Sequence, residues 1–309
     1  MAFLSEIDVN WCPKLGTVLA NDEIIDGLSD RGGYEVIRKK MTQWSIRISA
    51  YSERLLKGLN NIDWPEPLKE MQRNWIGKSE GVLVKFDIID FDKQIEAFTT
   101  RIDTIYGVTF VTLAPEHPYV EYITSNENKS QVKDYILQSS KKTERDRISD
   151  VKTISGVFTG GYAIHPLSNK KLPIWISDYV LAGYGTGAVM AVPCGDQRDY
   201  NFAKFFKLPI INIFKDIDIS KEAFQSKEDF KLINSDFLNN LDFKKGFSKA
   251  INELEKVNKG THKVNYKLRD AVFSRQRYWG EPFPVYYKNS LPVMIDENFL
   301  PIILPEVDK

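Results

Sequence analysis

Two short segments of this 309-residue chain concentrate side chains that can hold and orient a polar substrate. Residues 99–104 read TTRIDT and place hydroxyls, a guanidinium and a carboxylate side by side. Residues 183–199 read GYGTGAVMAVPCGDQRD and include the carboxylates of Asp196 and Asp199. Such groups suit the hydrolysis of an activated ester, because this reaction needs orientation and a placed water more than a strong nucleophile.

The elements around both segments are predicted to hold these groups beside a core. The first segment leads into the apolar residues 107–111, which indicates a strand edge or loop that continues into a buried strand. In the second segment, residues 188–192 (AVMAV) are strand-like. Asp196 and Asp199 then precede residues 200–206 and are typical of the first turn of a helix.

Both segments resemble the editing domain of bacterial-type leucyl-tRNA synthetases. In that family the first peptide usually reads TTRPDT, and the second reads GTGAVMAVP followed by D-x-R-D. Residues 273–282 resemble the return to the family's catalytic core, and residues 18–23 and 72–81 resemble the segment that leads out of it. The chain departs from the family at Ile102, usually proline, and at Gly195, where many relatives have histidine. The resemblance covers nearly the whole chain.

The resemblance implies a mixed α/β (α+β) fold, that of the editing domain of class I leucyl-, isoleucyl- and valyl-tRNA synthetases, with an N-terminal helical connector. We predict three parts. Residues 1–78 form a helical connector from the catalytic core, residues 79–265 form the editing domain, and residues 266–309 start the returning catalytic core. Short β-type runs that alternate with helical segments in the middle part agree with this fold class.

Periodicity predicts individual elements. Apolar residues recur at helical spacing in two stretches separated by the turn 62–67, and we expect them to pack two helices together: Trp44, Ile48, Tyr51 and Leu55, then Leu68, Met71 and Trp75. Strand-like runs cover 82–86, 108–112, 189–192 and 210–214, and an amphipathic helix covers 244–256. The charged, poorly periodic residues 216–242 are expected at the periphery.

The resemblance also assigns roles to individual residues. Asp199 is expected to anchor the α-ammonium of the substrate, since a carboxylate accepts charge-assisted hydrogen bonds from such a cation. Thr99 and Thr100 are expected to bond the ester carbonyl, the ribose or the attacking water. Thr104 is expected to crowd the branched side chain of leucine and so spare the correct product. The further expected substrate-binding residues are Arg101, Asp103, Tyr184, Met190, Val192 and Asp196.

Some of these residues have equally plain structural interpretations. Asp199 suits an ordinary helix N-terminus as well as a substrate site. Met190 and Val192 suit core packing almost as well as a pocket wall. Tyr184 stands between two glycines, and we expect it to stack or form a hydrogen bond near the adenosine.

The activity implied is editing, the hydrolysis of the aminoacyl ester on leucine-specific tRNA mischarged with norvaline or isoleucine. A leucine pocket rejects near-isosteres by only ~1–3 kcal/mol, so a second, hydrolytic site removes the errors. The implied partners are this tRNA, through its 3′-terminal aminoacyl adenosine, and the remainder of the synthetase in cis. The ATP-handling signatures HIGH and KMSKS do not occur here. We therefore interpret the chain as part of a longer protein and expect no amino-acid activation.

Editing is expected to need no cofactor, since ATP and Mg²⁺ serve only the full-length synthetase. No metal is expected either. Cys12 and Cys194 are the only cysteines and lie far apart, and His117, His165 and His262 follow no metal-ligand spacing, so each histidine is expected to be structural or at the surface.

Composition bounds the class of protein. A hydrophobic fraction of 42% can fill a sizeable core, and at ~150 residues per domain the length suggests two domains. The formal net charge of zero argues against a broad electrostatic grip on nucleic acid, so tRNA contacts are expected to be local. No apolar run is long enough to span a membrane and no signal peptide opens the chain, which predicts a cytoplasmic protein without membrane contact.

Three other interpretations stay open from the residues. The nearest is an isoleucyl- or valyl-tRNA synthetase editing domain, although Arg101 and Asp103 differ from the TTTPWT peptide usual there. The second is a fragment that binds the tRNA acceptor end without independent turnover. The third is a metal-dependent hydrolase that uses Asp196 and Asp199, for which histidine support is lacking.

Overall fold

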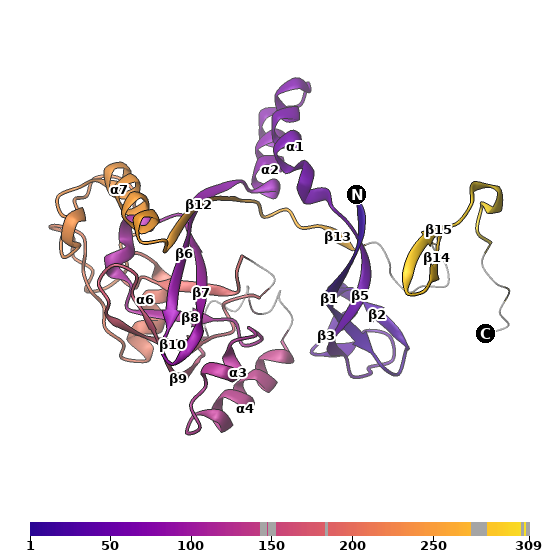
Figure 1. Ribbon diagram of the computed structural model, residues 1–309, viewed down its shortest axis with the longest axis horizontal. Helices are drawn as coiled ribbons and strands as arrows, with labels where there is room; N and C mark the ends of the chain where they lie inside the picture. Colours follow the sequence, from indigo (N-terminus) through magenta and orange to yellow (C-terminus); the bar gives the residue numbers. More distant parts are fainter. Residues whose placement is uncertain (143–146, 148–152, 183–184, 273–282, 304–305, 307–309) are drawn as a thin grey trace. The chain divides into compact units, whose positions relative to one another are not determined.

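The computed structural model describes residues 1–142, 147, 153–182, 185–272, 283–303 and 306 (Figure 1). The chain divides into two compact units. The first comprises Met1–Tyr51 and Arg269–Lys309, and the second comprises Ser52–Leu268. The second unit is therefore nested, in chain order, between the two segments of the first.

The first unit is built on an antiparallel sheet with the strand order β13-β5-β1-β2. Its long central pair runs from Ala2 opposite Ile46 to Trp11 opposite Ile37, and β13 extends the β5 edge with Ala271 opposite Ile46. The elements of this unit are β1 (Ala2–Cys12), β2 (Thr17–Leu19), η1 (Asn21–Glu23), β3 (Ile24–Ile25), β4 (Leu28–Ser29), β5 (Ile37–Ile46), η2 (Ile48–Tyr51), β13 (Ala271–Val272), β14 (Val285–Lys288), β15 (Leu291–Met294) and η6 (Glu297–Phe299).

The prediction that residues 1–78 form a helical connector is wrong for the residues of this sheet, which form strands. Trp44 lies in strand β5, and only Leu55 of its apolar series lies in an α-helix. The neighbours of Trp44, Gln43 and Ser45, are buried, which is a period of two rather than of 3.6. Pairing with β1 along the whole of β5 overrides the helical spacing of the four apolar residues.

The second unit has the predicted mixed α/β architecture (Figure 1). Among the described residues, seven strands form one sheet in the order β11-β8-β10-β9-β6-β12, with β7 paired to β6. Strand β7 also contacts β11 from the opposite end of this order, so the sheet curls on itself. The elements are α1 (Ser52–Gly58), η3 (Leu59–Asn61), α2 (Glu66–Ile76), β6 (Ser79–Ile88), β7 (Phe91–Thr99), η4 (Ile102–Gly107), β8 (Phe110–Leu113), α3 (Val120–Ile123), α4 (Lys129–Ser140), β9 (Val157–Ile164), β10 (Lys171–Ile176), β11 (Ala188–Ala191), α6 (Gln197–Phe205), η5 (Asp236–Leu238), α7 (Phe243–Lys256) and β12 (Gly260–Asn265).

The core of this unit follows from strand alternation. Val82, Val84 and Phe86 of β6 are fully buried, and so are Ile95 and Ala97 on the facing strand β7. Side chains two positions apart lie on the same face of a strand, so each strand presents one apolar face to the interior. Other strands and helix α7 add to the same hydrophobic cluster.

Helix α2 has clear start and stop signals. It begins after Pro65, whose fixed φ suits the position before a helix, and it ends at Gly77 in the left-handed conformation with a φ of 59°. The predicted turn at 62–67 thus separates α1 from α2. Among the described residues, no helix is both long and apolar enough to cross a membrane.

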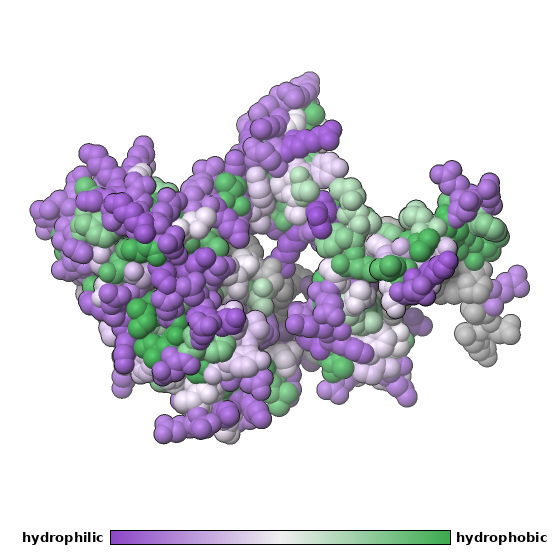
Figure 2. All heavy atoms as spheres, viewed as in Figure 1, coloured by the Kyte–Doolittle hydropathy of each residue, from purple (hydrophilic) through white to green (hydrophobic). Residues whose placement is uncertain are grey.

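The expectation that apolar residues of α1 and α2 pack these helices together is wrong for several of them. Trp75 is 72% exposed, Met71 57% and Leu55 48%. On the face drawn in Figure 2, this helix pair carries mainly hydrophilic side chains with a few hydrophobic ones among them.

Three further expectations concern the last third of this unit. The helix over 244–256 is confirmed as α7, with Gly246, Ala250 and Leu254 buried on one face. The strand over 210–214 is wrong, since only Phe214 forms an isolated bridge, to Leu232. The segment 216–242 is irregular apart from the helical turn η5, but its expected place at the periphery is wrong for Phe230, Leu232 and Leu238, which are buried in the main hydrophobic cluster.

The close approach of β6 to the end of β7 can be tested at Gly81. A methyl group there would collide with the carbonyl oxygen of Thr99 and the ring of Phe98. We expect Gly81→Ala to lower the free energy of unfolding by about 2–3 kcal/mol, measured by chemical denaturation. Gly58 is the matched control, because it has helical backbone angles and open space around it. Gly58→Ala should stabilise the chain by about 0.4–1 kcal/mol, and equal effects of both changes would contradict the packing described.

Candidate functional site

The two segments singled out from the sequence meet at one end of the curled sheet. The first begins at Thr99, the last residue of β7, and continues into the turn η4. The second follows β11 and enters α6. A Cβ atom built on Gly195 would lie 3.5 Å from Cγ1 of Val192 and 3.8 Å from Cγ2 of Thr104. Residues about ninety positions apart in sequence therefore line one wall.

Asp199 points inward from the first turn of α6. Its residue is only 4% exposed, and it shares the inner face of the helix with Phe202 and Ala203. Its Oδ2 accepts the backbone N–H of Val192 at 2.8 Å, and its Oδ1 accepts the hydroxyl of Tyr179 at 3.2 Å. The carboxyl group thus ties helix α6 to the end of strand β11.

The electrostatic environment of Asp199 is unusual for an aspartate. Burial, assisted by the nearby Asp196 carboxylate, raises its pKa to about 8, and the hydrogen bonds from Val192 and Tyr179 oppose this shift. The side chain is therefore mostly protonated at neutral pH when no cation is beside it. A cation that enters the site would stabilise the ionised form of this buried carboxyl group.

Asp196 is exposed and caps α6. Its side chain accepts the backbone N–H groups of Arg198 at 2.9 Å and of Asp199 at 3.1 Å. The predicted helix start with acidic residues in its first turn is confirmed.

The threonine hydroxyls at the end of β7 differ in their local bonding. Thr99 Oγ1 accepts the backbone N–H of Arg101 at 3.0 Å, which leaves its own hydrogen to donate elsewhere. Thr100 is half-buried, and its hydroxyl makes no hydrogen bond to the described residues. Both hydroxyls retain a capacity for further hydrogen bonds.

Arg101 and Asp103 bind each other. The Arg101 guanidinium donates from Nε to Asp103 Oδ1 at 3.0 Å and from Nη2 to Asp103 Oδ2 at 2.9 Å. Arg101 Nη1 also donates to the carbonyl oxygens of Gln225 and Ser226, both at 3.3 Å. The Asp103 side chain is fully buried, so this pair fixes the start of η4 against the loop near residue 225. Their predicted contact with substrate stays a prediction.

Thr104 is 2% exposed and turns its hydroxyl back onto the chain. Its Oγ1 donates to the carbonyl oxygen of Arg101 at 2.7 Å, while its methyl group lies near Gly195. Met190 and Val192 are each 5% exposed and belong to the main hydrophobic cluster. Tyr184, like the segment 273–282, lies outside the described residues.

Tyr179 is a site residue that the sequence did not indicate. Besides Asp199, its hydroxyl contacts Thr112 Oγ1 at 3.3 Å, and the Arg198 guanidinium lies 5.5 Å from the centre of its ring. Burial, together with the nearby Asp199 carboxyl group, raises the pKa of the Tyr179 hydroxyl, which therefore remains a donor. It lies on the loop after β10, just before the second segment, and it was missed because its contact with Asp199 exists only in the folded protein.

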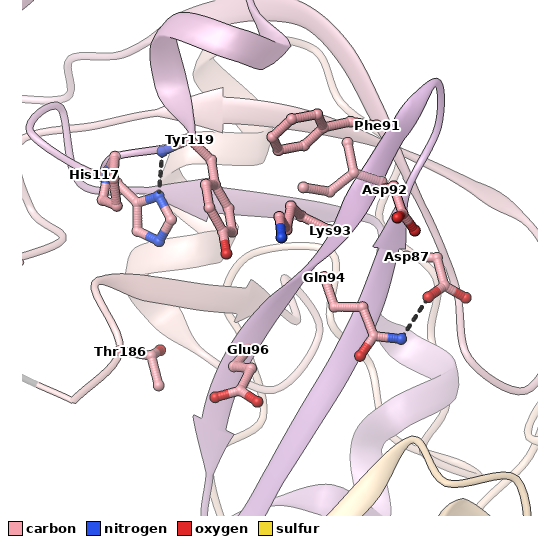
Figure 3. A pocket seen from close by; sticks show the side chains of 11 residues that line it. Asp87, Phe91, Asp92, Lys93, Gln94, Glu96, His117, Tyr119 and Thr186 are labelled. Atoms are coloured by element: carbon pink, nitrogen blue, oxygen red, sulfur yellow. Dashed lines mark hydrogen bonds between the residues drawn. The ribbon is translucent and has the colours of Figure 1, made fainter.

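Two cavities formed by described residues lie in this unit. One, of about 780 Å³, lies beside the β6–β7 hairpin. In Figure 3, Phe91 and Tyr119 stand across this cavity from Glu96 and Thr186. A smaller cavity of about 370 Å³ is lined by Tyr106 and His165, among others. Neither contains a predicted site residue. In the described part of the chain, no group of three or more histidine, cysteine or acidic side chains is placed to hold a metal ion.

Comparisons with known proteins agree on one family. The family described as "Leucyl-tRNA synthetase, editing domain" matches residues 73–255. The leucine–tRNA ligase of Flavobacterium johnsoniae is 64% identical over 314 residues, an alignment that covers 100% of this chain and 33% of that protein. The leucine–tRNA ligase of Cytophaga hutchinsonii is 56% identical over 311 residues and is covered to 34%.

A solved structure shows the same arrangement of elements. It is the ternary complex of an Agrobacterium radiobacter K84 LeuRS with tRNA and LeuAMS. It matches with a TM-score of 0.75 and 33% identity, over 98% of this chain and 35% of that chain. The chain thus spans about a third of the length of the relatives it matches.

The raised pKa of Asp199 predicts a specific dependence of stability on pH. An unfolded aspartate has a pKa of about 3.9, so the folded protein holds an extra proton between about pH 4 and pH 8. The stability contributed by this group is full below that window and is lost as the pH rises through it. Asp199→Asn cannot ionise. Its free energy of unfolding relative to wild type should therefore rise by up to about 1.4 kcal/mol per pH unit in this window.

The measurement is chemical denaturation at a series of pH values. Asp196→Asn is the matched control, because asparagine caps helices as well as aspartate but removes the charge that helps to raise the pKa of Asp199. In this variant the upper end of the pH window should move toward lower pH, while the lower end stays where it is. Parallel curves for wild type and Asp199→Asn would contradict the buried, protonated carboxyl group.

Proposed function

The chain belongs to the leucyl-tRNA synthetase editing-domain family, and we propose that it hydrolyses the aminoacyl ester of leucine-specific tRNA mischarged with norvaline or isoleucine. The observation that carries this proposal is the buried Asp199 carboxyl group at the junction of β11 and α6. The family match sets aside the isoleucyl and valyl alternatives.

Asp199 is suited to bind the α-ammonium of the aminoacyl group. A free α-amino group has a pKa of about 7.7–8.0 and is largely cationic at pH 7. When such a cation lies beside Asp199, the pKa of the carboxyl group falls and an ion pair forms in a site with little water. Each carboxyl oxygen accepts one hydrogen bond within the protein. Both can accept a further hydrogen bond from the substrate.

The threonines supply the remaining polar contacts that the reaction needs. Thr99 can donate its hydroxyl hydrogen while it accepts from Arg101, and Thr100 can both donate and accept. Hydroxyls at the end of β7 can therefore hold the ester carbonyl, the ribose or the attacking water. An ester is already activated, so orientation by Asp199 and these hydroxyls is sufficient chemistry for hydrolysis.

Selectivity is assigned to Thr104. Its hydroxyl is held by the Arg101 carbonyl group, so its methyl group is fixed near Gly195. We propose that this methyl group crowds the branched end of leucine, whereas linear norvaline fits beside it. A single methyl contact of this kind discriminates by ~1–3 kcal/mol.

The wider setting follows from the family. We propose that no cofactor is needed for the hydrolysis, and that ATP and Mg²⁺ serve only the complete synthetase. The proposed partners are leucine-specific tRNA, through its 3′-terminal aminoacyl adenosine, and the rest of the synthetase polypeptide, working in the cytoplasm. The tRNA in the matched LeuRS structure supports the choice of nucleic acid.

Deacylation of leucine-specific tRNA carrying norvaline, isoleucine or leucine tests the activity. The wild-type chain should hydrolyse the first two esters and spare the third. Asp199→Ala should lose at least about 30-fold in rate, since removal of one partner from a buried charge pair costs about 2–5 kcal/mol. Asp134→Ala removes an exposed carboxylate on α4 and should change nothing. Activity should also survive a chelator.

Two results would decide against parts of this proposal. A folded wild-type chain that hydrolyses none of the esters would favour the alternative of an acceptor-end binding fragment that depends on the rest of the synthetase. Activity that disappears with a chelator and returns with a divalent metal would favour the metal-dependent alternative.

Thr104 has its own test. Thr104→Ala removes the proposed steric block, so hydrolysis of the leucyl ester should rise about tenfold or more, while that of the norvalyl ester changes little. Thr104→Val keeps the bulk but loses the hydroxyl, and it should continue to spare leucine. If both variants protect the leucyl ester as wild type does, the block lies elsewhere.

A further inference from the structure

We propose that His165 is a positioning residue that fixes the turn carrying Thr104 and thereby sets the discrimination between amino-acid side chains. The role in discrimination rests on the proposed function, whereas the role in fixing the turn does not. His165 lies in the connection between β9 and β10 and is only 2% exposed. It touches neither the threonine hydroxyls nor Asp199, so its action is through another residue.

The hydrogen bonds of His165 fix its tautomer. Its Nδ1 is approached by the backbone N–H groups of Leu167 at 3.2 Å and Ser168 at 3.0 Å. Backbone N–H groups only donate, so Nδ1 is the acceptor and carries no hydrogen. Nε2 therefore carries the hydrogen and donates it to the carbonyl oxygen of Ile105, at 2.9 Å. Burial lowers the pKa of His165, which keeps the ring in this neutral form.

The acceptor is the residue directly after Thr104. The Ile105 carbonyl oxygen also accepts the N–H of Val108, at 3.2 Å. On the other side, the Arg101 carbonyl oxygen accepts both the N–H of Thr104 at 3.0 Å and its hydroxyl at 2.7 Å. Thr104 is thus held between two fixed carbonyl groups, one of which is fixed by His165.

The His165 hydrogen bond holds the side of this turn that faces the cavity. Residues 102–107 form a 3-10 helix, η4, whose hydrogen bonds have poorer geometry than those of an α-helix and do not hold long runs. The cavity of about 370 Å³ opens beside it, with Tyr106, Val108 and His165 in its lining. Helix α7 packs against η4, and Ile102 and Ile105 are fully buried, so the imidazole adds a link to the β9–β10 connection on the side of the cavity.

Two variants separate the two sides of the ring. His165→Asn places an amide oxygen near the position of Nδ1 and can still accept from Leu167 and Ser168, but it is too short to reach Ile105. His165→Gln places an amide N–H near the position of Nε2 and can still donate to Ile105. If His165 acts through the Ile105 carbonyl group, the glutamine variant should behave like wild type and the asparagine variant should not.

The experiment combines two readouts on the full 309-residue chain. Amide hydrogen exchange of residues 101–108 should be about tenfold faster in His165→Asn than in wild type and little changed in His165→Gln, as expected for the loss of one hydrogen bond. The ratio of norvalyl to leucyl ester hydrolysis on leucine-specific tRNA should fall about fivefold or more in the asparagine variant alone. This ratio is independent of the fraction of folded protein.

Each outcome of this experiment supports or overturns a stated part of the proposal. Unchanged exchange in His165→Asn, or equal changes in both variants, would overturn the positioning role. Faster exchange with an unchanged ratio would overturn the link to discrimination. If wild type hydrolyses neither ester, the proposed function fails, whereas the exchange data still decide whether His165 fixes the turn.

Discussion

One carboxyl group holds the candidate site together. The N–H of Val192 lies just beyond the end of β11, and a buried backbone donor at this point needs an acceptor from outside the sheet. Asp199 supplies it from helix α6, which requires that the carboxyl group be buried. That burial raises its pKa to about 8. The architecture of the β11–α6 junction and the readiness of Asp199 to receive a cation therefore have the same cause, and neither can be altered without the other.

Most of the other charges near the site are already satisfied within the protein. Arg101 and Asp103 neutralise each other under the loop near residue 225, and Asp196 is occupied by the first amide groups of α6. These groups define the shape of the wall more than its charge. The groups with spare capacity are the hydroxyls of Thr99 and Thr100 together with Asp199. Among the described residues, the site therefore offers a ligand few but well-fixed contacts.

The features that could be predicted from the sequence are those set by residues close together in the chain. The start of α6 at Asp196 is an example, since capping involves residues two and three positions away. The misassigned helix around Trp44 shows the limit, because pairing of β5 with β1 is decided some forty residues upstream. Tyr179 and His165 were likewise beyond reach as members of the site. Their importance lies in hydrogen bonds to Asp199 and Ile105, and only the folded sheet brings those partners together.

The nesting of one unit inside the other has a consequence for biosynthesis. Strand β13 pairs with the edge of β5, yet Ala271 is translated more than two hundred residues after its partner Ile46. At about 5–20 residues per second, a ribosome takes on the order of 10–40 s to cover that distance. During this interval the end of β5 at Ser45 and Ile46 lacks the strand that later pairs with it and is open to pairing with another chain. Slower translation would lengthen that period.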